Sequence, residues 1–266
     1  MDGLGPSDNN SGHTASDLPQ AALKLTGLTK SFGAKQAVNA LDLRVEPGEF
    51  YALLGPNGAG KTTTLRMAAN LLRPDSGSIS IFGVDARANP VAAKAITAWL
   101  PDEPMLYDKL TPVEYLEFIA GLWNVPPSVA QKRAAVLLDI LELGPNRNVR
   151  CEGFSRGMKQ KVALAGALVH EPRLIMLDEP LTGLDAAIAR QVKDLLTARV
   201  RDGATIILTT HILEVAERLA SRIGIVRSGR LVAQGTMEEL RAQFGGSAST
   251  LEDVFLKLTT GQDAVQ

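Results

Sequence analysis

An eight-residue segment, GPNGAGKT at 55–62, has the residue types needed to bind phosphate groups. It fits the pattern G-x-x-x-x-G-K-[ST], in which glycines let backbone N–H groups approach phosphate oxygens closely. Lys61 is then placed to reach the β- and γ-phosphates, and the Thr62 hydroxyl is placed to coordinate Mg²⁺. We expect ATP or a similar nucleotide to contact Gly55, Pro56, Asn57, Gly58, Ala59, Gly60, Lys61, Thr62 and Thr63.

Two adjacent carboxylates, Asp178 and Glu179, follow a short apolar run at 174–177. The carboxyl end of a strand is where ligands bind in α/β sheets. The aspartate therefore fits a role in the Mg²⁺ shell, and the glutamate could orient the water that attacks the γ-phosphate. The alternative is a strand that ends in a solvated acidic turn.

The elements around the first motif fit a phosphate site. The apolar segment 50–54 before it predicts a buried strand, and 62–72 after it has helix-forming composition. A strand, a glycine loop and a helix N-terminus in this order direct amide donors and a helix dipole at an anion.

The rest of the chain divides into three parts. Alternating apolar residues at 22–28, 38–45 and 78–82 predict antiparallel strands. From about 86 to 170 the pattern is helical, and no strand is evident between about 103 and 172. Strands and helices alternate again from 174, with strands expected at 204–208, 223–226 and 231–233.

These parts predict an α/β fold. We expect a P-loop NTPase core with a mostly parallel sheet, an N-terminal antiparallel β subdomain and an inserted helical subdomain. Capping boxes at Thr111, Ser128 and Thr236 are expected to start three of the helices.

Composition bounds the class of protein. The chain has 266 residues, 45% of them apolar and 21% charged, with a net charge of −1. These values are ordinary for a globular protein, and no basic excess indicates a nucleic-acid partner. Cys151 is the single cysteine, which fits a reducing compartment. No apolar run approaches the ~20 residues that span a bilayer, and the polar residues 1–21 are expected to form a disordered tail.

The segment 154–158, FSRGM, resembles the LSGGQ signature of ABC-transporter ATPase subunits. It keeps Ser155 and Gly157 and departs at Phe154, Arg156 and Met158. Such variants are typical of the subgroup that powers small-molecule and drug exporters. A serine that only caps a helix is the alternative for this segment taken alone.

The resemblance extends over about 22–258. Thr182–Asp185 matches the family's D-loop, His211 its γ-phosphate-contacting histidine, and Phe32 the aromatic residue that stacks on adenine. It implies an ATPase domain over 22–245, with the helical subdomain at about 103–170. A C-terminal helix and tail at 246–266 resemble the LEDVF-like ending of exporter ATPases.

One position of the resemblance differs. Asp102 stands where the family has a glutamine at the end of a strand. Carboxylate and amide oxygens both accept a hydrogen bond from Mg²⁺-bound water, but aspartate adds charge and is one methylene shorter. Asp102 either replaces the glutamine in the metal shell, which we favour, or only couples this loop to a partner.

The resemblance implies an ATPase subunit that energises an integral-membrane permease from the cytoplasmic face of the cell membrane. Glu179 would be the catalytic base, His211 and Lys61 would contact phosphate, and Thr62, Asp178 and Asp102 would form the metal shell. Ser155 and Gly157 would complete the nucleotide site of a second subunit, and Asp185 of the D-loop is expected to bind nucleotide. A homodimer is expected, although a heterodimer is allowed.

Two other classes of function fit these motifs less well. Soluble relatives that act in translation or repair typically carry two cassettes or a long coiled-coil insertion, whereas this chain has one cassette. A kinase does not fit the signature and D-loop, and the Asn-Lys-x-Asp segment of GTPases is missing from the sequence.

Overall fold

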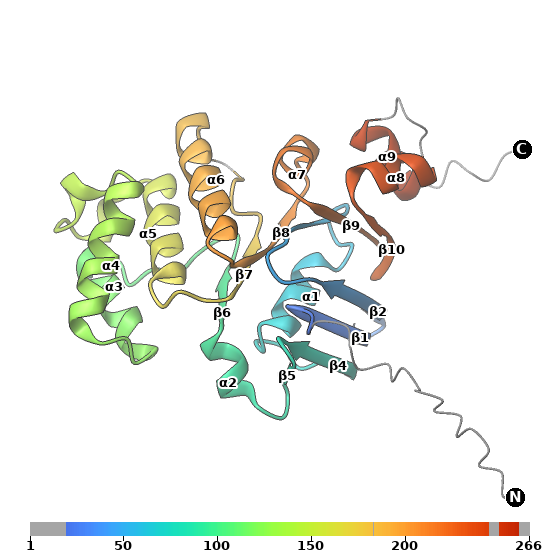
Figure 1. The fold of residues 1–266 in the computed structure, drawn as a ribbon, viewed down its shortest axis with the longest axis horizontal. Coiled ribbons are helices and arrows are strands. Elements are labelled where there is room, and N and C mark those ends of the chain that lie inside the picture. Colours follow the sequence, from blue (N-terminus) through green and yellow to red (C-terminus); the bar gives the residue numbers. More distant parts are fainter. Residues whose placement is uncertain (1–19, 183, 245–249, 261–266) are drawn as a thin grey trace, which may run out of the picture.

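The computed structural model describes residues 20–182, 184–244 and 250–260, which form two sheets and their covering helices (Figure 1). The strands are β1 Leu23–Phe32, β2 Lys35–Val45, β3 Phe50–Leu54, β4 Ser76–Ile81, β5 Val84–Asp85, β6 Thr97–Leu100, β7 Leu174–Asp178, β8 Thr205–Thr210, β9 Arg222–Arg227 and β10 Arg230–Gly235. The helices are α1 Lys61–Ala68, α2 Pro90–Ala95, α3 Pro112–Leu122, α4 Pro127–Ile140, α5 Arg156–Leu168, α6 Ala186–Arg201, α7 Leu213–Leu219, α8 Met237–Phe244 and α9 Leu251–Thr260.

The six-stranded sheet carries the phosphate loop and both carboxylates. Its strand order is β10-β9-β3-β8-β7-β6, and all neighbours are parallel except β9 and β10. Every residue of β3, β7 and β8 is buried, as expected for central strands covered on both faces. Parallel strands end at the same edge, so the segments after β3, β6, β7 and β8 meet there.

The four-stranded sheet is antiparallel, with the order β2-β1-β4-β5. Helix α1 contacts β1 and β2 of this sheet and β7 of the other (Figure 1). Leu65 and Met67 of α1 are fully buried in a core with Leu23 of β1 and Leu53 of β3. The four-stranded sheet and α1 thus hold the phosphate loop from one side.

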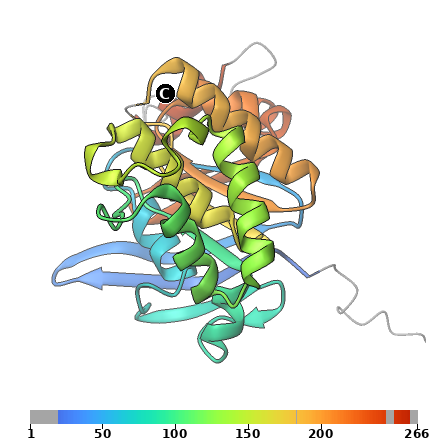
Figure 2. The same ribbon diagram turned by 90° about the vertical axis from the view of Figure 1, so that its left-hand side faces the viewer.

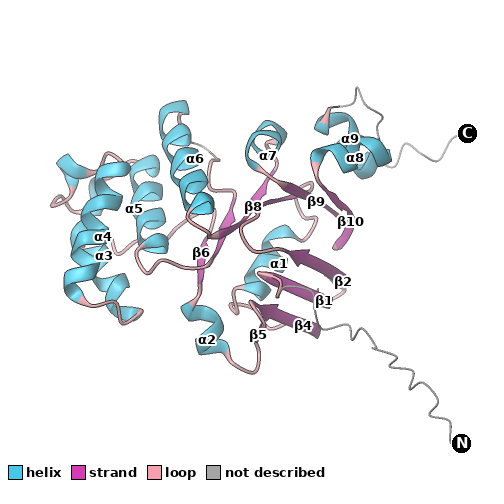
Figure 3. Ribbon diagram, in the orientation of Figure 1, coloured by secondary structure: helices cyan, strands magenta, loops and turns pink. Residues whose placement is uncertain are grey.

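Helices α3, α4 and α5 pack against one another and form a separate group beside the six-stranded sheet (Figures 2 and 3). Gly166 allows α5 to approach α3, because a Cβ at this position would lie 2.6 Å from the Tyr115 ring. This group is reached from β6 through the loop 101–111, which connects the edge of the sheet to α3.

The expected fold is confirmed, as are the antiparallel strands, the absence of strands within 103–172, and the capping boxes at Thr111 and Thr236. The capping box expected at Ser128 is wrong, since α4 begins at Pro127 after a Pro126 cap with no side-chain bond. Strand β6 lies within the region where the sequence pattern is helical.

The structure changes the expected boundary of the N-terminal tail and gives the bounds of the expected C-terminal helix. Residues 1–19 lie outside the described part of the chain, but Ala21, placed in the expected tail, is buried. The expected C-terminal helix is present as α9, and its Leu251 and Val254 are fully buried in a cluster with Leu240 of α8 and Ile225 of β9.

Candidate functional site

The phosphate loop lies between β3 and α1, and its glycines are required by its neighbours. A Cβ on Gly55 would lie 2.4 Å from the Val226 carbonyl oxygen, and one on Gly60 would lie 2.4 Å from the Ala37 carbonyl oxygen. Gly60 also has φ of 107°, which favours glycine. Because Gly60 caps α1 without a side-chain bond, the first amides of this helix are available to an anion.

Lys61 is buried, and its Nζ donates to the carbonyl oxygens of Gly55 at 2.6 Å and Pro56 at 3.3 Å. Burial lowers the pKa of this ammonium group, whereas the nearby carboxylates of Glu179 and Asp178 act in the opposite direction. The ammonium group therefore rests on its own loop, where phosphate oxygens would be stronger partners.

Asp178, at the end of β7, is buried and accepts two hydroxyl hydrogen bonds on the same oxygen. Its Oδ1 lies 3.1 Å from Thr62 Oγ1 and 2.6 Å from Thr209 Oγ1. A hydroxyl and a carboxylate oxygen are ligands that Mg²⁺ prefers. The donor set of Thr62 and Asp178 thus fits a magnesium ion.

Glu179 is held in an unusual backbone conformation. Its φ is 48°, in the left-handed region that a non-glycine residue rarely adopts. Its N–H donates to Thr209 Oγ1 at 3.1 Å, while its Oε2 lies 3.0 Å from His211 Nδ1 and accepts from Thr182 Oγ1 at 3.2 Å. Strained backbone conformations of this kind concentrate at functional sites. Here the side chain of the strained residue, Glu179, contacts His211.

Residues 57–63 and both carboxylates line one cavity of about 350 Å³, whereas Gly55, Pro56 and His211 are not among its described lining residues. Phe32 is at its rim with 52% of its surface exposed, and the Lys30 ammonium lies 5.6 Å from the centre of its ring. The described residues that line this cavity are Phe32, Lys35, Ala37, Asn57, Gly58, Ala59, Gly60, Lys61, Thr62, Thr63, Asp102, Asp178 and Glu179. The sequence pattern did not indicate Lys35 and Ala37, which reach the cavity because β2 runs beside the loop.

Asp102 follows β6 and lies at the edge of this cavity. Burial raises the pKa of its carboxyl group, Asp178 and Glu179 raise it further, and the Arg156 guanidinium opposes them. Arg156 Nη2 lies 3.5 Å from Asp102 Oδ1.

Ser155, Gly157 and Asp185 do not appear among the described residues that line the cavity of their own chain. The Ser155 hydroxyl caps α5 by accepting from Met158 N at 3.2 Å, and the Asp185 carboxylate caps α6. A Cβ on Gly157 would lie 2.6 Å from Ile188 Cδ1, so the end of the Ile188 side chain would have to shift to admit a larger residue where α5 approaches α6.

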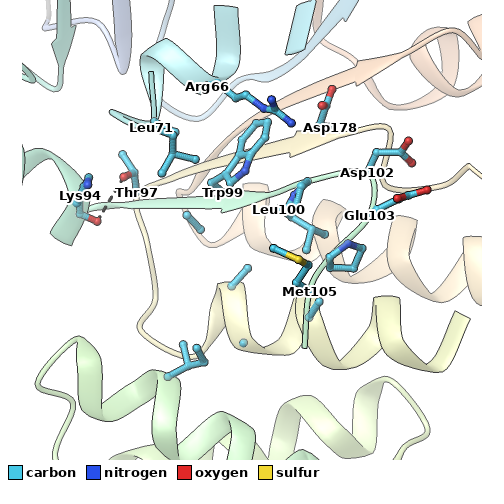
Figure 4. Close-up of a pocket in the computed structure, with 18 of the residues that line it drawn as sticks. Arg66, Leu71, Lys94, Thr97, Trp99, Leu100, Asp102, Glu103, Met105 and Asp178 are labelled. Carbon is cyan, nitrogen blue, oxygen red and sulfur yellow. Dashed lines mark hydrogen bonds between the residues drawn. The ribbon is translucent and has the colours of Figure 1, made fainter. Parts of the chain in front are cut away.

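A larger cleft of about 1130 Å³ opens between the six-stranded sheet and the helical group. Figure 4 shows Asp102 and Glu103 at one end of it and Lys94 at the other. Met105 is 93% exposed at this cleft. No local sequence pattern indicates the cleft, because its walls come from segments far apart in the chain.

Comparison with known proteins agrees with this geometry. The sequence model of the family described as "ABC transporter" matches residues 38–182. The daunorubicin/doxorubicin resistance ATP-binding protein DrrA of Streptomyces peucetius is 39% identical over 88% of this chain and 71% of that protein. The ABC-type transporter ATP-binding protein EcsA of Bacillus subtilis is 33% identical over 89% of this chain and 96% of that protein.

Solved structures show the same fold. An ATP-binding subunit of an ABC transporter has a TM-score of 0.84 at 33% identity, covering 89% of this chain and 99% of its own. A dimeric ATP-binding cassette bound to ADP and Pi has a TM-score of 0.74 at 26% identity, covering 81% and 98%. With the phosphate loop, the paired carboxylates and these relatives in agreement, the chain belongs to the ABC transporter family as an ATP-hydrolysing, ATP-binding subunit.

Proposed function

We propose that this ATPase powers the export of a small, drug-like molecule through an integral-membrane permease. The observation that carries the proposal is the meeting of Lys61, Thr62, Asp178 and Glu179 in one cavity that adjoins a large open cleft. Two relatives named for resistance to daunorubicin and linearmycin support the exporter class.

Within the cavity, each residue has a distinct role. Lys61 leaves the carbonyl oxygens of its own loop and binds the β- and γ-phosphates. Thr62 and Asp178 would hold Mg²⁺, which would neutralise phosphate charge, and Asp102 would contribute to its shell. Phe32 stacks on the base, because an aromatic ring binds the face of any base.

Glu179 is the general base that takes a proton from the attacking water. His211 orients it through the 3.0 Å contact between Nδ1 and Oε2, and its ring contacts the γ-phosphate. In this arrangement Asp178 would hold the metal, while the neighbouring Glu179 accepts the proton. Thr182 accompanies His211 in fixing the Glu179 carboxylate.

A second copy of the chain completes each site. Ser155, Gly157 and Asp185 lie outside the lining of their own cavity, and the N-terminus of α5 can bring backbone amides to a phosphate across a dimer. We propose a homodimer that encloses two ATP molecules. The solved dimeric cassette supports this arrangement.

The permease would dock at the cleft, on the cytoplasmic face of the membrane. Among the described residues, no helix combines the length and the apolar character that crossing a bilayer requires. Leu71 and Met105 are exposed apolar side chains on the cleft walls, and they offer a membrane partner an apolar contact.

The test is to identify a permease gene beside the gene of this chain and to co-express the two products. We expect the two to copurify, and ATP turnover to rise when the permease is present in lipid vesicles. Replacing Met105 with Glu should reduce copurification while ATP binding stays intact. Full ATP turnover that depends on ribosomes or DNA, with no association with a membrane protein, would contradict the transport function and support the soluble alternative.

A further inference from the structure

Two residues that depart from the family's pattern contact each other in the structure. Asp102 stands where the family has glutamine, and Arg156 lies within the altered signature segment. They are 54 positions apart in sequence, yet Arg156 Nη2 lies 3.5 Å from Asp102 Oδ1. The two departures therefore form one ion pair between the loop after β6 and the first residue of α5.

Charge explains why the two changes belong together. Asp102 shares its cavity with Asp178 and Glu179, so it adds a third carboxylate to a site that must bind an anion. A glutamine at this position would add no charge. A carboxylate without a compensating cation would repel the phosphates over the short distances within one cavity.

A second ion pair joins the same loop to the same turn of α5. Lys159 is three residues along α5, on the same face of the helix, and its Nζ lies 2.9 Å from Asp108 Oδ1. Asp102 and Asp108 both belong to the loop 101–111. This loop is thus bound to the first turn of α5 at two points, and one of them borders the nucleotide cavity.

We propose that Arg156 is a positioning residue for nucleotide binding, whose guanidinium neutralises Asp102 so that the pair replaces the neutral glutamine of the family. The proposal rests on the nucleotide cavity described above. Lys159 makes the equivalent contact outside the cavity, because Asp108 is not among the described residues that line it.

The test measures the Kd of ATP in EDTA by isothermal titration calorimetry on the full chain, at low and high salt. Arg156→Gln should weaken binding about three- to tenfold at low salt, and high salt should reduce this difference.

Asp102→Asn should bind ATP at least as tightly as wild type. The double variant should return to about the wild-type Kd, because the repelling charge is then gone. Arg156→Lys should also stay near wild type.

Lys159→Gln is the matched control, since it removes a cation from the same helical turn. Its Kd should equal that of wild type, and the unfolding temperatures should show that every variant is folded. An unchanged Kd for Arg156→Gln, a double variant as weak as Arg156→Gln, or equal weakening by Lys159→Gln would overturn the proposal. If wild type failed to bind ATP both in EDTA and in the presence of Mg²⁺, the nucleotide cavity itself would be contradicted, and this inference with it.

Discussion

The two halves of the candidate site are held in different ways. On the sheet side, Lys61 and Asp178 are buried and bonded at 2.6–3.3 Å to backbone and hydroxyl groups. On the helical side, Arg156 and Asp102 form a 3.5 Å ion pair with about half of each side chain exposed. Buried hydrogen bonds preorganise a site, whereas exposed ion pairs contribute about 1 kcal/mol or less. The sheet side is therefore a rigid, preorganised part of the site. The helical side, which carries the signature segment 154–158, can separate from it with little loss of free energy.

The largest expected effect is on ATP turnover, at Glu179, the proposed general base. Glu179→Gln should lower ATP turnover by about 100-fold or more, because a general base typically contributes that much. ATP binding should persist, since the amide keeps the shape of the side chain. Glu152→Gln, which alters an exposed glutamate paired with Lys109, is the control and should match wild type. Wild-type turnover in Glu179→Gln would remove the base from the account.

The next largest effect concerns phosphate binding on the sheet side. Lys61→Ala should weaken ATP binding about 10- to 100-fold, because charge-assisted hydrogen bonds contribute about 1.5–3 kcal/mol. Calorimetric titration of the isolated chain measures it. Lys94→Ala removes a lysine at the far end of the cleft and should leave the Kd of ATP unchanged. Equal losses in the two variants would mean that general charge, not the loop, binds the nucleotide.

A smaller effect is expected where α5 meets α6. Gly157→Ala and Gly121→Ala both replace a glycine inside a helix and gain helix propensity, but only the first places a methyl group against Ile188 Cδ1. Gly157→Ala should therefore be about 1 kcal/mol less stable than Gly121→Ala, with a melting temperature about 2–4 °C lower. Adding Ile188→Val removes Cδ1 and should restore most of this difference. Equal melting temperatures for the two single variants would contradict the close approach.

The smallest effect belongs to the exposed ion pair itself. Asp102→Gln restores the residue type of the family pattern, and ATP turnover should stay within about fivefold of wild type. A coupled-enzyme assay of ATP turnover measures this. Near-complete loss of activity would show that the carboxylate is specifically required, and that the two sides of the site depend equally on single charges.

The same contrast explains what the sequence could predict. The phosphate loop occupies eight consecutive positions and the carboxylates two, so their chemistry is visible in local patterns. The Thr111 capping box was equally local, but that at Ser128 failed because Pro126 and Pro127 set the start of α4. Strand β6 has only four residues and is recognised by its pairing with β7 rather than by its own pattern.

Features that depend on distant contacts were not visible in the sequence. The cleft joins residues from α1, β6, α3 and α5, and Lys35 and Ala37 reach the nucleotide cavity from β2. The Asp102–Arg156 pair appeared in the sequence as two unrelated departures from a family pattern. Only the fold brings these two side chains into contact.

The most direct test of the two-sided site is complementation between two inactive variants. Glu179→Gln disables the sheet side, and Ser155→Arg blocks the signature side; each alone should hydrolyse ATP poorly. Mixing them in equal amounts should restore roughly a quarter of wild-type turnover, because half of the random dimers are mixed and each has one complete site. Mixtures no more active than the separate variants, under conditions where mixed dimers are detected, would contradict a site shared between two copies of the chain.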